Sequence, residues 1–298
     1  MTAGKLNLAA SVRARLQNRA RADNVNFQQM LTRFALERLL YRLSISKHGD
    51  QFLLKGALLF DLWYQKPLRP TQDVDFLGFG SADVARIAGL FRDICSVDVE
   101  DGIAFDTASV RATVIRHEAN YGGVRVNLLG TLAGARCPVQ ANVGFGDAVT
   151  PGPVDAIYPM LLPDLPAANL RVYTKYTVIA EKFHTIVEHG IENSRMKDFF
   201  DLWVLTREPN LDLGILRQAI AATFDRRRTA LPAATPIGLS DEFVADRLKQ
   251  SQWLGFASRS RIDAPPLEQV ISHLRDFFAS IRIGATPEAA KPKSGTAR

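Results

Sequence analysis

The apolar residues of this chain change their spacing twice along its length, and this change limits the folds that the chain can adopt. Within residues 6–47, Phe27, Met30, Leu31 and Phe34 follow the i, i+3, i+4, i+7 spacing of one helical face. Residues 52–146 instead hold short apolar or β-branched runs bounded by glycines, which is typical of strands. After residue 172 the helical spacing returns. The pattern predicts an α+β protein in which helices flank a mixed sheet of short strands.

The expected elements can be given by residue range. We expect helices at the positions where apolar residues recur every three or four residues. Strands are expected at 52–54, 73–77, 110–115, 124–129 and 139–145, and helices at 57–64, 84–95, 212–224, 240–250 and 266–282.

A proline-rich stretch, residues 150–172, predicts a linker or an extended segment at a domain boundary. The expected division is therefore N-terminal helices over 1–47, an α+β core over 48–150 and a helical C-terminal lobe over 151–284. Residues 285–298 lack large apolar side chains and are expected to be a disordered tail.

The net charge of +6 and the pI of about 9.4 favour polyanionic partners such as nucleic acid, although many basic proteins have no such partner. No apolar run reaches the length of a membrane span, and the N-terminus lacks the apolar core of a secretory signal. Cys95 and Cys137 do not make a disulfide framework or a metal-ligand spacing. We expect a cytoplasmic protein without a membrane partner.

Asp73-Val74-Asp75 is the segment that points most directly to chemistry. Alternate residues of a strand face the same side, so both carboxylates project together while Val74 faces the core. Adjacent anions repel one another unless a cation lies between them, and Mg²⁺ prefers hard oxygen ligands that it shares with substrate phosphates. The segment predicts a magnesium site that takes part of its ligands from substrate phosphates. Two solvated aspartates at a strand end are the alternative interpretation.

A second element lies just before this pair. Lys55-Gly56-Ala57 joins an expected strand to an expected helix, where a glycine lets a phosphate approach the backbone and a lysine adds a positive charge. Other chemistries find little support. The five histidines have no metal-ligand spacing, and the chain has no nucleophile elbow, Walker motif or dinucleotide fingerprint.

These segments together resemble the AbiEii-type nucleotidyltransferase toxins. The similar elements are Lys55-Gly56-Ala57, then Arg69-Pro-Thr71-Gln-Asp73-Val-Asp75, then Glu181-Lys182, and finally Arg195-Met-Lys197-Asp198-Phe-Phe-Asp201. They follow in the family's order over roughly residues 27–206. The resemblance implies Mg²⁺-dependent transfer of a nucleotide from a triphosphate, an antitoxin partner and tRNA as one acceptor. It implies nucleotide contacts at Lys55, Gly56, Ala57, Arg69, Thr71, Lys182, Arg195, Lys197 and Asp201.

The charged residues after position 180 allow two interpretations. Lys197 and Asp201 are four apart and Arg195 and Asp198 three apart, so they can be ordinary ion pairs on a helix surface. The resemblance instead assigns Lys182 to the triphosphate and gives Asp198 a catalytic role beside Asp73 and Asp75.

Two departures from the family pattern affect this expectation. Ala57 stands where a second glycine or a serine is usual, which leaves the backbone N–H in place. Asn142 stands where an aspartate is common, so a second metal ion would be held less tightly, and Asp147 is the nearest acidic replacement. An inactive binding module of the same fold therefore remains as an alternative. Transfer to a small molecule or a protein is another, because the matched segments are less specific for the substrate than for the family.

Overall fold

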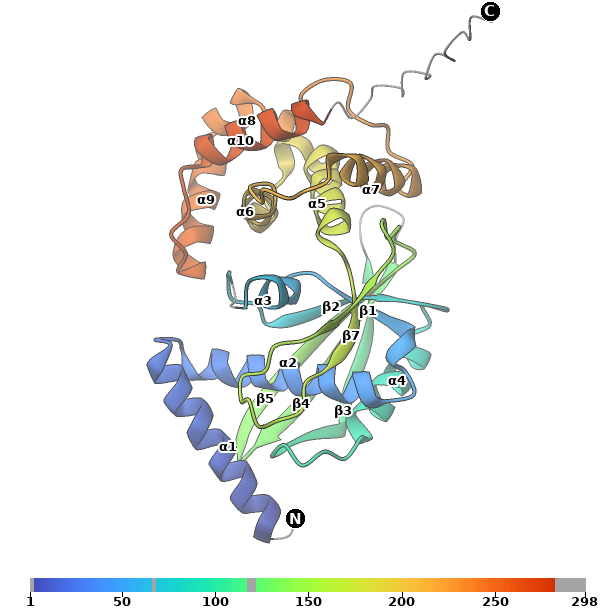
Figure 1. Cartoon of the computed structure of the whole chain (residues 1–298), viewed down its shortest axis with the longest axis vertical. Coiled ribbons are helices and arrows are strands. Elements are labelled where there is room, and N and C mark those ends of the chain that lie inside the picture. Colours follow the sequence, from blue (N-terminus) through green and yellow to red (C-terminus); the bar gives the residue numbers. More distant parts are fainter. Residues whose placement is uncertain (1–2, 66–67, 117–121, 282–298) are drawn as a thin grey trace, which may run out of the picture. The chain divides into compact units, whose positions relative to one another are not determined.

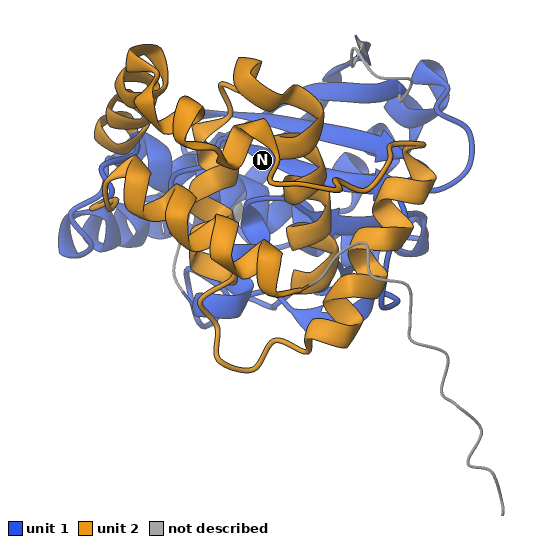
Figure 2. Ribbon diagram, turned by 90° about the horizontal axis from the view of Figure 1, so that it is seen from above, with its two compact units in different colours: residues 1–174, 260–262 blue, residues 175–259, 263–298 orange. Residues whose placement is uncertain are grey.

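The computed structural model of the chain describes residues 3–65, 68–116 and 122–281 (Figure 1). These residues form two compact units, coloured separately in Figure 2. Unit 1 comprises residues 1–174 and 260–262 and holds a sheet with helices, whereas unit 2 comprises residues 175–259 and 263–298 and is helical. The α+β class expected from the sequence is confirmed.

Within the described residues, seven strands form one mixed sheet in unit 1, in the order β3-β4-β5-β2-β1-β7-β6. The central strand β2 runs antiparallel to β1 and parallel to β5, and β1 runs parallel to β7. The strands are β1 (Phe52–Lys55), β2 (Asp73–Gly78), β3 (Ile103–Arg116), β4 (Gly122–Leu132), β5 (Ala135–Phe145), β6 (Val154–Ile157) and β7 (Asn169–Val172).

Alternation along the strands gives this sheet one apolar face. Val74 and Phe76 of β2 and Ala141 and Val143 of β5 are all buried. Helices α2 (Phe27–Ile45) and α4 (Val84–Ser96) pack beside these strands (Figure 1). The ring of Phe91 on α4 lies 6.4 Å from that of Phe76, a distance typical of packed aromatic pairs. Burying this face fixes the register of the strands, because a one-residue slip would expose it.

Helix α2 is also tied to the sheet by charge. Its Arg38 and Arg42 are buried and both donate to the carboxylate of Asp101, which precedes β3. Helix α1 (Ala3–Ala22) packs on α2, and α3 (Leu58–Tyr64) follows β1. Asn26 accepts hydrogen bonds from two backbone N–H groups at the start of α2, which is a favourable N-cap.

Unit 2 is built from helices around an aromatic core. Phe183, Phe199, Phe224 and Phe243 are almost fully buried, and the rings of Phe183 and Phe278 stack 3.9 Å apart. Its helices are α5 (Lys175–His189), α6 (Met196–Leu205), α7 (Leu213–Arg226), α8 (Asp241–Ala245), α9 (Arg247–Ser260) and α10 (Leu267–Ser280).

Three features differ from the sequence expectations or lie beyond them. The single helix expected over 240–250 is interrupted at Asp246, whose carboxylate accepts from the N–H groups of Leu248 and Lys249 and so caps a second helix. Strands within 150–172 extend the sheet, and the two compact units divide after Thr174. The tail expected at 285–298 lies outside the described residues.

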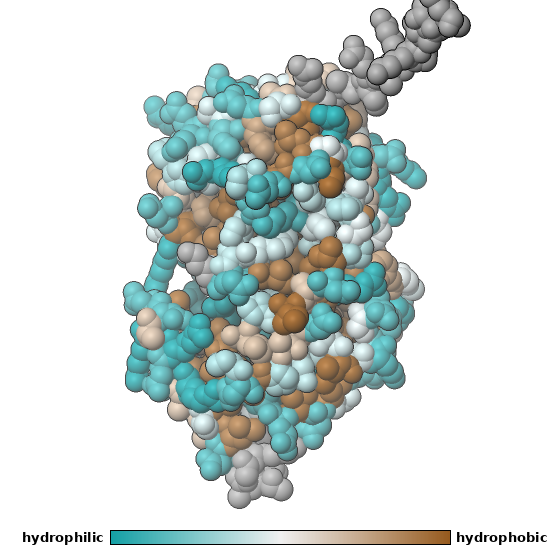
Figure 3. Space-filling model, viewed as in Figure 1, coloured by the Kyte–Doolittle hydropathy of each residue, from teal (hydrophilic) through white to brown (hydrophobic). Residues whose placement is uncertain are grey.

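The helices and the surface of the structure were compared with what a membrane span requires. No helix among the described residues is long and apolar enough to cross a membrane. On the face drawn in Figure 3, hydrophobic residues form separate patches among hydrophilic ones.

Candidate active site

Asp73 and Asp75 lie side by side on β2, as their spacing predicts. Val74 between them is fully buried, whereas both aspartates are partly exposed on the opposite face of the sheet. In the register of the sheet, Asp75 is directly opposite Lys55 of β1 on one side and Asn142 of β5 on the other. The three central strands therefore bring two carboxylates, a lysine and an amide into one neighbourhood.

Asn142 bridges the two carboxylates. Its Nδ2 atom donates to Asp73 Oδ2 and to Asp75 Oδ1, at 3.0 Å in each case. Its Oδ1 atom accepts a hydrogen bond of 3.0 Å from Nε of Arg125 on β4, the residue opposite it in the register. The position where the sequence suggested a weak metal ligand thus holds a hydrogen-bond donor that faces the anions.

The Lys55-Gly56-Ala57 turn lies against the same carboxylates. Gly56 has a φ of +78°, and a Cβ atom there would be 2.2 Å from Oδ2 of Asp75. Only glycine permits this approach, because any side chain would collide with the carboxylate. Ala57 follows as the N-cap residue of α3 and makes no side-chain capping bond.

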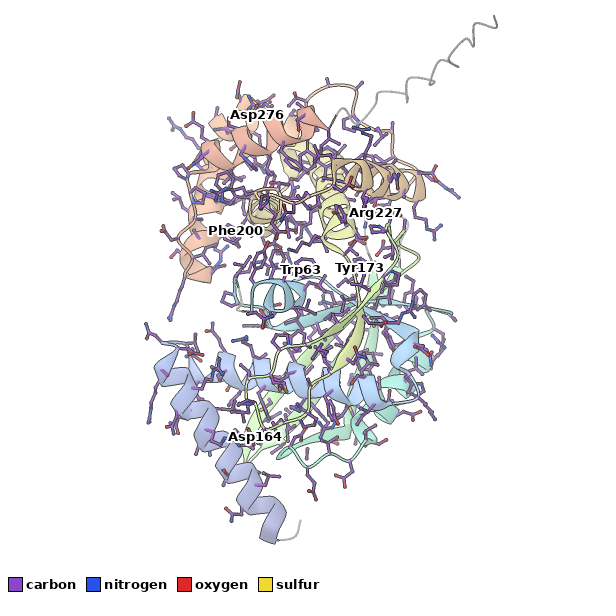
Figure 4. The ribbon with its side chains drawn as sticks, in the orientation of Figure 1. Trp63, Asp164, Tyr173, Phe200, Arg227 and Asp276 are labelled. Atoms are coloured by element: carbon purple, nitrogen blue, oxygen red, sulfur yellow. The ribbon has the colours of Figure 1, made fainter. Side chains whose placement is uncertain are left out.

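Lys55 is engaged by an acidic side chain in this structure. Its Nζ atom lies 2.6 Å from Oδ2 of Asp147, just beyond β5, and 5.3 Å from the ring centre of Tyr173, labelled in Figure 4. The hydroxyl of Tyr173 also donates to Asp147, at 3.5 Å. Asp147, considered above as a replacement metal ligand, is therefore a partner of Lys55.

Two further residues expected to bind nucleotide precede the aspartates. The hydroxyl of Thr71 donates to Oδ1 of Asp73 at 2.9 Å, so Thr71 orients a carboxylate. Arg69 is partly exposed in the segment leading to β2.

The second group of predicted residues forms an ion-pair cluster inside unit 2. Nζ of Lys182 on α5 lies 2.5 Å from Asp198 and 2.8 Å from Asp201, which are both buried on α6. Nε of Arg195 lies 2.7 Å from Asp198, and the Arg195 side chain is 47% exposed. Lys197 is exposed on the first turn of α6. The cluster joins two helices and offers Arg195 to the solvent.

The partners of Asp198 decide its chemistry. Burial alone would raise the pKa of this carboxyl, but the charges and hydrogen bonds of Lys182 and Arg195 outweigh it and hold the pKa well below its ordinary value. A carboxylate held so firmly in its ionised form is a poor proton acceptor at neutral pH. Asp198 also holds Arg195 in place at the start of α6 through their 2.7 Å ion pair.

The carboxylate pair has the donor chemistry that Mg²⁺ requires. Mg²⁺ binds oxygen atoms, and in triphosphate sites one or two protein carboxylates are commonly supplemented by phosphate oxygens and water. No cluster of three or more metal-binding acidic, histidine or cysteine side chains occurs among the described residues. The two carboxylates, Asp73 and Asp75, have the chemistry of the protein ligands in such a site.

The order of these elements can be compared with known families. The model of the family described as nucleotidyl transferase AbiEii toxin, type IV toxin–antitoxin system, matches residues 38–279. The chain belongs to this family.

Solved structures and curated proteins add further comparisons. The AbiEii-family chain is similar to the crystal structure of JHP933 from Helicobacter pylori, with 13% identity, a TM-score of 0.49, and coverage of 86% of this chain and 92% of that one. A putative nucleotidyltransferase from H. pylori gives the same identity and TM-score, with 86% and 96% covered. No curated protein matches the chain.

Two residues of this AbiEii-family site were not singled out from the sequence. Arg125 could have been found from strand alternation, because Val124 and Val126 are buried and Arg125 faces the other side. Tyr173 follows β7 and has no local signal, since its place beside Asp147 depends on the pairing of β7 with β1.

Proposed function

We propose that this chain transfers a nucleoside monophosphate from a Mg²⁺-bound nucleoside triphosphate to an acceptor hydroxyl, with the 3′ end of tRNA as the acceptor. The observation that carries the proposal is the pair of carboxylates on β2, partly exposed and packed against the Gly56 turn. The family supplies the reaction class, because AbiEii proteins are nucleotidyl transferase toxins of toxin–antitoxin systems.

The residues of unit 1 have distinct roles in this reaction. Asp73 and Asp75 would hold Mg²⁺, and Thr71 and Gly56 keep the two carboxylates in place. When bound there, the cation would supply positive charge against the phosphate groups. Lys55 exchanges Asp147 for a phosphate oxygen, and Arg69 and the backbone of Ala57 add donors to the triphosphate.

The transfer step balances without any further reactant. The acceptor oxygen forms a bond to the α-phosphorus, and the bond from that phosphorus to the oxygen bridging to the β-phosphorus breaks. Pyrophosphate leaves with that electron pair, and the acceptor proton passes to solvent. Catalysis comes from positive groups placed where negative charge develops.

We propose that the ion-pair cluster of unit 2 supports the binding of phosphate groups. Lys182 neutralises the buried Asp198 and Asp201, which fixes α5 against α6. Asp198 in turn orients Arg195, whose exposed guanidinium can pair with phosphate in a bidentate way. Lys197 adds a second exposed cation to the same helix end.

Charge supports a nucleic-acid acceptor. The chain carries a net charge of +6. On the sheet face that bears Asp75, one row of directly opposed residues runs from Asp75 through Asn142 and Arg125 to the exposed Thr113. Arg111 is exposed in the neighbouring row. Cationic and neutral polar side chains suit a phosphate backbone. We propose that the chain acts in the cytoplasm, where tRNA and triphosphates occur, and that a cognate antitoxin opposes it.

A labelling experiment tests this proposal. The purified chain is incubated with Mg²⁺, each α-labelled triphosphate in turn, total RNA and a protein extract. Asp75→Asn is run beside it, with Asp106→Asn as the control, since Asp106 is an exposed aspartate on another strand of the same sheet. Label in a tRNA-sized band with the unmodified chain and Asp106→Asn, and its absence with Asp75→Asn, is the expected result.

Other outcomes select the alternatives. Label in protein or in a small molecule would keep the chemistry and replace the acceptor. No transfer to any acceptor would favour an inactive binding module, for which Asn142 between the aspartates is the specific structural argument.

A further inference from the structure

Three hydrogen bonds link Arg125 to the proposed metal-binding carboxylates through Asn142. Arg125 Nε donates to Asn142 Oδ1, and Asn142 Nδ2 donates to one oxygen of Asp73 and one of Asp75, all at 3.0 Å. The contacts follow from the register, in which Arg125, Asn142 and Asp75 are directly opposed on adjacent strands. None of these three hydrogen bonds joins Arg125 directly to Asp73 or Asp75. Arg125 therefore acts on the carboxylates through Asn142.

Chemistry fixes which way the Asn142 amide points. A guanidinium has only donors, so the amide atom that faces Arg125 must be the oxygen. The amide nitrogen then faces Asp73 and Asp75, where its two hydrogens meet one carboxylate each. In this orientation Asn142 offers no ligand atom to a cation at the pair, because an amide nitrogen does not coordinate Mg²⁺ and its oxygen is engaged by Arg125.

When no nucleotide is bound, the same hydrogen bonds lower the affinity of the two carboxylates for a cation. Asn142 offsets the repulsion between the carboxylates without a metal and competes for two of their oxygens. Arg125 holds it there and places a positive charge behind it. Interactions of this kind, one step removed from the metal, commonly change metal affinity 10- to 100-fold.

We propose that Arg125 is a positioning residue that, through Asn142, restricts the Asp73–Asp75 pair to one divalent cation and keeps its affinity low until a triphosphate supplies further ligands. This inference rests on the proposed metal-binding role of Asp73 and Asp75. It predicts that the chain carries out transfer with a single cation at this pair, because the third position on the neighbouring strand is a fixed hydrogen-bond donor.

The test measures Mn²⁺ binding by electron paramagnetic resonance, with and without a non-hydrolysable triphosphate analogue, so its readout does not depend on activity. The unmodified chain should bind one Mn²⁺ at the pair, weakly alone and more tightly with the analogue. Asn142→Asp should bind a second Mn²⁺, because a third carboxylate replaces the donor. Arg125→Met should bind Mn²⁺ roughly tenfold more tightly without the analogue, since the Asn142 amide is then able to turn its oxygen toward the cation.

Two further variants separate orientation from charge. Arg111→Met removes the same charge from the same sheet face, but Arg111 donates to the backbone oxygens of Ala108 and Val110 and lies one row away from Asn142. Arg125→Lys keeps the charge and removes the Nε donor, so it should resemble Arg125→Met. It also preserves the test if Arg125→Met fails to fold.

The outcomes distinguish this inference from the function on which it rests. Two Mn²⁺ in the unmodified chain, or equal shifts for Arg125→Met and Arg111→Met, would overturn the positioning role and leave the proposed function intact. Unchanged Mn²⁺ binding in Asp75→Asn, or no binding in the unmodified chain, would overturn both.

Discussion

A Cβ atom on Gly56 would lie 2.2 Å from Oδ2 of Asp75. This contact joins the turn after β1 to the carboxylate on β2, and it explains why position 56 requires glycine. The backbone of the turn packs against the Asp75 carboxylate and so limits the positions that this carboxylate can take.

Gly56→Ala should abolish Mn²⁺ and triphosphate binding, because the new methyl group displaces the Asp75 carboxylate. Gly134→Ala is the matched control, since Gly134 has the same φ of +78° and open space where its Cβ would be. Both variants should lose about 1–2 kcal/mol of stability from the left-handed backbone. Thermal unfolding measures the loss of stability, and Mn²⁺ titration measures the loss of binding. Retained Mn²⁺ binding in Gly56→Ala would contradict the role of Gly56 in positioning Asp75.

Asp147→Asn should tighten triphosphate binding. Its carboxylate competes with the triphosphate for Lys55, and a hydrogen bond to a charged group is worth about 1.5–3 kcal/mol, so weakening this competition should lower the Kd about tenfold. Lys55→Met should weaken binding by a similar factor. Fluorescence titration with a labelled triphosphate checks both. Weaker binding in Asp147→Asn would mean that Asp147 positions Lys55 and does not compete for it.

Lys182→Met should destabilise unit 2 by about 3–5 kcal/mol, because it removes a cation shared by two buried carboxylates. Lys175→Met is the control on the same helix. Lys175 pairs with a single, partly exposed carboxylate, Glu208, so its loss should cost less stability than the loss of Lys182. Urea unfolding followed by tryptophan fluorescence gives both values. Equal losses would show that the burial of Asp198 and Asp201 adds nothing to the stability that Lys182 contributes.

The stability contributed by Asp198 should depend on pH in one direction. Its pKa is lower in the folded chain than in the unfolded one, so its contribution is complete above the ordinary aspartate pKa of 3.8 and is lost as the pH falls through the folded value. The difference in unfolding free energy between the unmodified chain and Asp198→Asn should therefore be constant near neutral pH and shrink below about pH 4. A difference that already shrinks between pH 7 and pH 5 would contradict this sign.

Much of the fold follows from local patterns. The alternation of Asp73, Val74, Asp75 and Phe76 predicts a strand with one buried and one exposed face, and β2 has that form. The pairing of the strands was harder to predict from the sequence. The prolines of residues 150–172 predict a linker or an extended segment, and the structure has the extended strands β6 and β7 there. Their place at the edge of the sheet could not be predicted, because β7 pairs with β1, which is far away in the sequence.

The sequence by itself determined that two carboxylates share one face of a strand, that a lysine and a glycine precede them, and that basic and acidic residues recur on later helices. Those features depend on spacing over a few residues, where backbone geometry is fixed. Only the tertiary structure decided that Arg125 orients Asn142, that Asp147 holds Lys55, and that Lys182 lies between Asp198 and Asp201. Side-chain partners that are distant in the sequence depend on strand register and helix packing, which are set by burial across the whole unit.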